Sequence, residues 1–71
     1  MTNSSELNAA IARAGISKKA LAEAMGLTYF GLWKKIRNKS EFKATEILTI
    51  QKLLNLTSSQ RDRIFFDTEG D

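Results

Sequence analysis

The segment Ser17–Asn38 reads SKKALAEAMGLTYFGLWKKIRN, and the order of its residue types decides the expected fold. Gly26 separates two short helix patterns and can adopt the left-handed conformation that a tight turn requires. Ala22 is small where the two helices must approach closely, and Leu32 and Ile36 lie four residues apart on one face of the second pattern. The segment therefore predicts two short helices that pack against each other across a tight turn.

Such a pair is typical of a helix-turn-helix, a motif whose second helix docks in the major groove of DNA. Ser17 and Thr28 stand where the N-caps of the two helices would lie, and Leu27 would fill the corner between the helices. We therefore expect a helix-turn-helix over residues 17–38. Thr28 would cap its helix whatever the function of the protein.

The residues before this segment predict one helix. Asn3 is a suitable N-cap for a helix over residues 5–14, with Glu6 reaching back from the third helical position. Gly15 would end this helix. Its apolar side chains recur at helical spacing: Leu7, Ala10, Ile11 and Ala14.

The residues after the segment predict two further helices. The loop 39–43 carries Phe42, which we interpret as a core anchor between helices. A helix over 44–54 would direct four apolar side chains inward: Ile47, Ile50, Leu53 and Leu54. Thr57–Gln60 is a capping-box pattern that would open a last short helix ending in Ile64, Phe65 and Phe66. The acidic tail 67–71 would be frayed.

Length and composition limit what the chain can be. Its 71 residues are enough for one all-α domain of about five short helices, spanning 1–71, and too few for a deep enzyme cleft. The absence of cysteine and histidine excludes disulfides, zinc-finger sites and histidine-dependent catalysis. No nucleophile–base pair, metal-ligand set or phosphate loop is present, so we expect no enzyme, no cofactor and no metal. We also expect no membrane span and no signal peptide, hence a cytoplasmic protein.

Positive charge is concentrated in one part of the chain. The net charge is +3, but residues 17–43 carry seven lysines and arginines against two glutamates. This part is therefore at +5, and the remainder of the chain is at −2. Lysine-rich helices are often simply well solvated, so charge alone does not decide between solubility and a polyanionic partner. The coincidence of the charge with the predicted motif favours DNA.

These residues resemble those of a known family, the Cro/repressor-type (XRE-like) helix-turn-helix regulators of temperate phages. It is most similar to very short regulators from phages of Gram-positive bacteria. The resemblance covers nearly the whole chain and is carried by Leu21-Ala22, Gly26-Leu27, the segment 35–43, Glu46-Ile47, the segment 53–57 and the terminal Ile64-Phe65-Phe66. It implies a compact five-helix domain of the lambda-repressor type, in the cytoplasm of a bacterial host.

The resemblance also implies a function and a set of site residues. A Cro-like protein of the lysis–lysogeny switch would bind operator DNA and regulate transcription. The base-reading candidates on the third helix are Thr28, Tyr29, Phe30, Trp33 and Lys34. The phosphate-binding candidates are Ser17, Lys18, Lys19, Arg37, Asn38, Lys39 and Ser40. Lys18 and Lys19 could instead form only a solvated first turn, and Lys35 could lay its alkyl stem against the core.

The reading helix departs from the residues that usually contact base edges. Asn, Gln and Arg are good readers, whereas this helix presents Tyr29, Phe30 and Trp33. We expect Trp33 and Tyr29 to be exposed, and Phe30 either to pack or to meet a thymine methyl group. Gly31 costs helix stability, which suggests that something approaches that face closely.

An exposed aromatic cluster is also typical of a protein–protein hot spot. The second hypothesis is therefore an antirepressor that binds the repressor of the same phage through this helix and blocks its DNA binding. An antitoxin-like regulator or an isolated structural domain remains as a further alternative. Phe65 or Phe66 could form a homodimer surface, although both could also close the core against Leu7 and Ile11.

Overall fold

Polar residues begin most of the helices in the computed structural model, which describes residues 1–66. Side-chain oxygens of Asn3, Ser17, Thr28 and Thr57 each accept a hydrogen bond from the backbone N–H three residues later. Lys43 begins the remaining helix, and its N–H donates to Glu46 Oε1 at 2.8 Å. The helices are α1 (Ser4–Ala14), α2 (Lys18–Ala24), α3 (Tyr29–Ile36), α4 (Ala44–Leu53) and α5 (Ser58–Phe65). The all-α fold expected from the sequence is confirmed.

Left-handed residues end the first four helices. Gly15 and Gly26 have φ of 71° and 72°, and Asn38 and Asn55 take the same conformation after α3 and α4. After α2, α3 and α4, the next backbone N–H donates to a carbonyl five residues earlier, as in Leu27 to Ala22 at 2.9 Å. These short-range signals explain why the predicted boundaries agree with the structure to within one or two residues.

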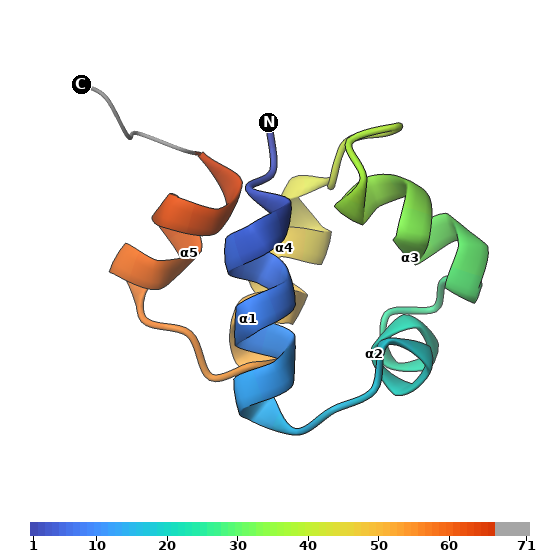
Figure 1. Cartoon of the computed structure of the whole chain (residues 1–71), viewed down its shortest axis with the longest axis horizontal. Helices are drawn as coiled ribbons and strands as arrows, with labels where there is room; N and C mark the ends of the chain where they lie inside the picture. Colours follow the sequence, from blue (N-terminus) through green and yellow to red (C-terminus); the bar gives the residue numbers. More distant parts are fainter. Residues whose placement is uncertain (67–71) are drawn as a thin grey trace.

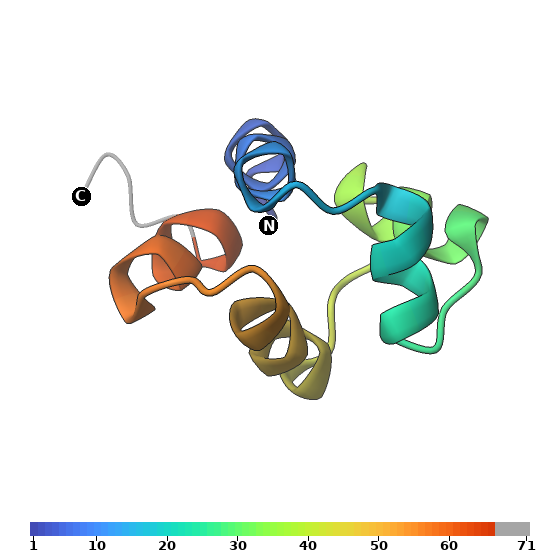
Figure 2. The ribbon, with the colours of Figure 1, turned by 90° about the horizontal axis from the view of Figure 1, so that it is seen from below.

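Within residues 1–66, five helices surround one apolar core. Figure 2 shows α1 and α4 on opposite sides of it, with α5 closing one end and the α2–α3 pair the other. In Figure 1, α1 lies in front of α4, and α3 forms the outer edge of the molecule. The buried apolar side chains come from every helix and from the residue after α4: Leu7, Ala10, Ile11, Leu21, Ala22, Leu32, Ile36, Ile47, Ile50, Leu54, Ile64 and Phe65.

The N-terminal segment connects the two ends of the molecule. Thr2 N–H donates to Asn38 Oδ1 at 2.8 Å, and Asn38 Nδ2 donates back to the carbonyl of Thr2 at 2.9 Å. The Ser4 hydroxyl donates to the carbonyl of Ile36 in the last turn of α3. Asn3 N–H donates to the carbonyl of Ile64 in α5 at 2.7 Å. The expected hydrogen bond from the Asn3 N–H to the Glu6 side chain does not form, because the Asn3 N–H donates to Ile64 of α5 instead.

Two expectations about buried residues were wrong. Ala14 on α1 and Leu53 on α4 were expected to point inward, but both are exposed. At the end of the last helix, Phe65 is 5% exposed and Phe66 is 56% exposed, so one of the two phenylalanines closes the core. Phe65 packs edge-on against Phe42 at 5.3 Å between ring centroids, so Phe42 does anchor its loop to the core. Phe66 alone remains a candidate for contact with a second copy.

No helix within residues 1–66 has both the length and the apolar character needed to cross a membrane. The expectation for the tail 67–71 lies outside the described residues.

Candidate functional site

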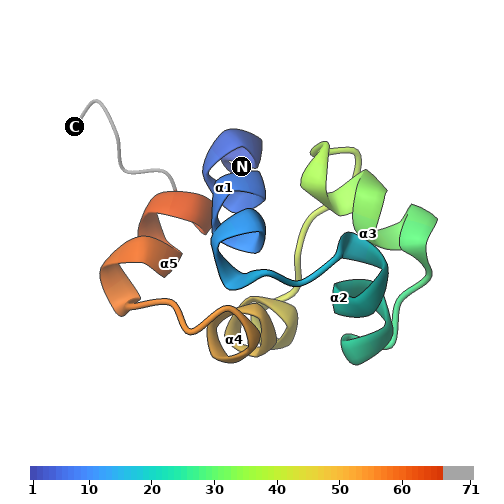
Figure 3. The same cartoon turned by 60° about the horizontal axis from the view of Figure 1, so that its bottom comes forward.

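The α2–α3 pair forms one end of the molecule, opposite α5 (Figure 3). The four residues Met25–Thr28 connect the two helices. The buried side chains of Leu21 and Ala22 on α2 and of Leu32 on α3 belong to the common core. The opposite face of α3 is turned toward solvent, since Tyr29 and Phe30 are exposed while Leu32 is buried. Figure 1 shows α3 at the outer edge of the molecule.

Aromatic rings cover the outer face of α3. Phe30 is 63% exposed and Tyr29 is 54% exposed. The rings of Phe30 and Trp33 stack, with centroids 5.5 Å apart and planes 14° from parallel. Trp33 is therefore half-buried, whereas we expected it to be exposed, because Phe30 covers part of its ring. Tyr29 is exposed as expected.

Two cations lie against these rings. Lys34 Nζ is 5.7 Å from the centroid of the Phe30 ring, and the Arg37 guanidinium is 5.3 Å from the centroid of Trp33. Both pairs are four residues apart, so the helix places each cation one turn beyond its ring. A cation held over a ring face is attracted by about 0.5–1 kcal/mol at an exposed site. We call this set of residues the aromatic–basic face: Tyr29, Phe30, Trp33, Lys34 and Arg37.

The contact between Gly31 and the Thr28 side chain explains why a glycine is suitable at position 31. A Cβ at this position would lie 3.1 Å from Thr28 Oγ1, which accepts the Gly31 N–H at 2.9 Å. The close approach that we inferred from the sequence is therefore made by the cap of α3. Thr28 is confirmed as this cap, and its hydroxyl oxygen already accepts one hydrogen bond.

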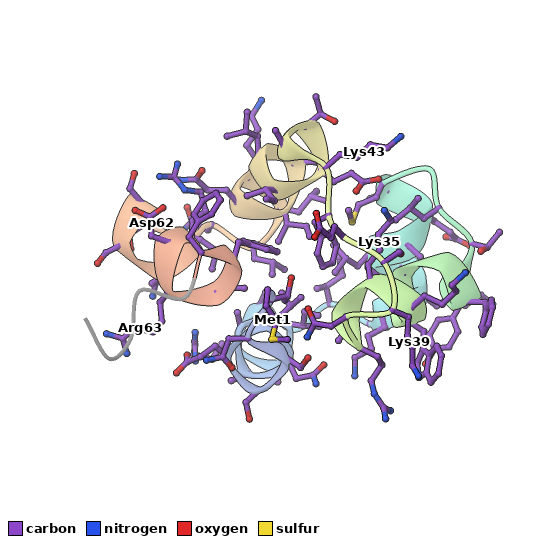
Figure 4. The ribbon with its side chains drawn as sticks, turned by 90° about the horizontal axis from the view of Figure 1, so that it is seen from above. Met1, Lys35, Lys39, Lys43, Asp62 and Arg63 are labelled. Atoms are coloured by element: carbon purple, nitrogen blue, oxygen red, sulfur yellow. The ribbon has the colours of Figure 1, made fainter. Side chains whose placement is uncertain are left out.

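Most of the basic residues at this end have no acidic partner. Within residues 1–66 the ion pairs are Lys35–Glu46 and Arg61–Asp62. The cations on α2, on the outer side of α3 and after α3 therefore form none with the described part of the chain: Lys18, Lys19, Lys34, Arg37 and Lys39. Figure 4 shows Lys39 at this end and Asp62 and Arg63 at the opposite end.

Lys35 is different from its neighbours. Its ammonium donates to the carbonyl of Glu41 at 2.9 Å and lies 3.2 Å from Glu46 Oε1. It also lies 6.0 Å from the centroid of Phe42. The Lys35 and Glu46 side chains are only 13% and 14% exposed, so Lys35 joins α3 to the start of α4. This agrees with the alternative in which Lys35 packs within the protein.

Asn38 was expected to bind phosphate, but its side chain is used elsewhere. The amide oxygen and nitrogen each make one hydrogen bond to the backbone of Thr2, so the side chain is held toward the N-terminal segment. Ser17 Oγ accepts from Ala20 N–H at 3.0 Å, which leaves its hydroxyl hydrogen for a partner. Arg37, Lys39 and Ser40 are exposed after α3; Lys19 is exposed and Lys18 half-buried in the first turn of α2.

Sequence reasoning missed two features of this site. The ring–cation pairs could have been found, because residues four apart on a helix are neighbours. No pattern in the sequence predicts the hydrogen bonds between Asn38 and Thr2, because these residues are 36 positions apart.

Comparison of the chain with protein-family models, with curated proteins and with solved structures finds no significant match.

Proposed function

We propose that this protein is a sequence-specific DNA-binding regulator whose helix-turn-helix places α3 in the major groove. The observation that carries the proposal is the gathering of basic residues around the outer face of α3, where Lys34, Arg37 and Lys39 form no ion pair within residues 1–66. A polyanion would supply the missing counter-charges. The resemblance to short phage regulators suggests a Cro-like role in the lysis–lysogeny switch.

The residues divide into two kinds of contact. Lys18 and Lys19 at the start of α2, with Arg37, Lys39 and Ser40 after α3, would bind phosphates on either side of the groove. Tyr29, Phe30 and Lys34 would face base edges, since they occupy the outer side of α3. Thr28 and Trp33 would act mainly by holding α3 and the Phe30 ring in place.

A salt titration of DNA binding tests the proposal. The probe is a duplex from the intergenic region beside the gene of this protein, with unrelated duplex as competitor. The variant combines Lys34→Ala, Arg37→Ala and Lys39→Ala. It should weaken binding by orders of magnitude and make the slope of log affinity against log salt shallower by about 1.8, since Arg37 and Lys39 each account for one phosphate contact and each such contact contributes about 0.9.

A matched variant controls for net charge. Arg13→Ala, Lys52→Ala and Arg63→Ala remove the same three charges from exposed positions on α1, α4 and α5. This variant should retain both affinity and slope. Equal effects of the two triple changes would contradict docking through α3. Circular dichroism of both variants confirms that the helices are retained.

A second candidate function follows from the aromatic rings. Phe30 and Trp33 form a pre-arranged apolar surface with a basic rim, which suits a protein partner as well as DNA. The partner would be the repressor of the same phage. Titration calorimetry with that repressor tests this function: binding should be lost with Trp33→Ala and should change little with salt. Absence of heat at tens of micromolar would reject it.

A further inference from the structure

Phe30 combines exposure with a fixed position. The residue is 63% exposed, yet its ring is stacked on that of Trp33 and lies near the Lys34 ammonium. An unsupported phenylalanine on a helix surface would sample several rotamers and lose this freedom on binding. Here the neighbouring side chains restrict the ring before any ligand arrives. An apolar contact made by this ring would therefore cost little additional entropy.

The chemistry of the ring restricts what it can read. Phenylalanine has no hydrogen-bond donor or acceptor, so the polar base edges of the major groove gain nothing from it. A polar group covered by the ring would lose its water without receiving a partner. The apolar group that the major groove presents is the C5-methyl group of thymine, which 5-methylcytosine also carries.

We propose that Phe30, supported by Trp33, recognises the C5-methyl group of a pyrimidine in the bound DNA. The inference rests on the proposed DNA-binding function. The surrounding charge favours this ligand over a free apolar partner, because Lys34 and Arg37 border the rings and have no acidic counterpart within residues 1–66. In the major groove a methyl group would contact the Phe30 ring, while a base edge would accept from Lys34 and a phosphate from Arg37.

The test removes only the methyl group. Binding sites are first selected from a random 20-base-pair duplex pool with the whole chain. Each thymine of the selected duplex is then replaced in turn by deoxyuridine, which pairs identically and lacks the C5-methyl group. At one or two positions the wild-type protein should bind the uracil duplex about fourfold more weakly, as expected for one buried methylene-sized group.

A second arm distinguishes the two sources of the methyl group. At the same positions a cytosine duplex is compared with a 5-methylcytosine duplex. A methyl preference in the thymine pair alone would identify thymine as the ligand, and a preference in both pairs would show that the methyl group is read on either base. Both results support the proposal.

Variants connect the preference to Phe30. Phe30→Ala should bind the thymine and uracil duplexes equally, whereas Phe30→Leu should retain most of the preference because it keeps an apolar side chain. Lys39→Ala should weaken binding to both duplexes and leave their ratio unchanged. Since Phe30 lies on the surface, its replacement should leave the helical signal in circular dichroism intact.

The outcomes separate this inference from the proposed function. Salt-dependent binding with equal affinity for thymine and uracil at every position would overturn methyl recognition and leave DNA binding in place. A preference that persists in Phe30→Ala would overturn the assignment to this residue. Failure of the folded protein to bind any duplex at low salt would overturn both.

Discussion

Two asparagines illustrate how residues with the same backbone role can differ in what their side chains do. Asn38 and Asn55 each follow a helix with φ of 62° and 54°. The amide of Asn38 makes two hydrogen bonds to Thr2, while Asn55 makes no side-chain hydrogen bond within residues 1–66. The left-handed backbone conformation explains why asparagine is suitable at both positions, and the hydrogen bonds to Thr2 distinguish Asn38 from Asn55.

The first prediction compares these asparagines. Glycine retains the left-handed conformation at either position, so the cost in chain entropy is shared by Asn38→Gly and Asn55→Gly. Asn38→Gly should lower the free energy of unfolding by about 1–2 kcal/mol more than Asn55→Gly, because two hydrogen bonds are lost. Urea unfolding measures both. Equal destabilisation would show that the contact with Thr2 contributes nothing to stability.

At the scale of the element, α3 has two chemically distinct sides. Leu32 and Ile36 enter the core, and Lys35 joins α3 to α4 through Glu46. The adjacent Lys34 lies instead over the exposed ring of Phe30. A single residue step, about 100° around the helix axis, thus separates a lysine that joins two helices from a lysine available to a ligand.

Adjacent lysines give the second prediction. Lys35→Ala should lower the free energy of unfolding by about 1–3 kcal/mol, since it removes a charged hydrogen bond and leaves Glu46 largely buried without its partner. Lys34→Ala should cost no more than about 1 kcal/mol, because it removes only the contact of its ammonium with the Phe30 ring. DNA titrations are made at a temperature where both variants are folded. There Lys34→Ala should lose more DNA affinity than Lys35→Ala, although it loses less stability. Similar behaviour of the two variants in both assays would contradict this division.

At the scale of the whole molecule, stability depends on one small core shared by all five helices. A chain of this size has a free energy of unfolding of about 4–11 kcal/mol. Loss of one large buried side chain is therefore a substantial part of the total. Leu7 of α1 is fully buried in this core, whereas Leu48 of α4 is exposed.

The third prediction follows from this difference. Leu7→Ala should cost about 2–5 kcal/mol and leave a detectable unfolded fraction at 37 °C, because it opens a cavity among side chains that cannot fully relax. Leu48→Ala should be within about 0.5 kcal/mol of the wild type. Thermal melting followed by circular dichroism compares them. A comparable cost at Leu48 would indicate that this exposed side chain is covered in solution, for example by a second copy.

The sequence by itself determined the number of helices, most of their boundaries and most of the core. N-caps such as Thr57, left-handed residues such as Gly26 and apolar spacing such as Leu32 with Ile36 act over a few residues, so they can be read without a structure. The charge of residues 17–43 and the aromatic residues of α3 were visible in the same way.

Only the tertiary structure decided which side chains remain available to a ligand. Lys34 and Lys35 are the same residue type on the same helix, and the nearness of Glu46 from α4 separates them. Asn38 is occupied by Thr2, and Phe65 is buried while Phe66 is not, because segments far apart in the chain meet there. Such contacts depend on the packing of all five helices, which no local pattern specifies.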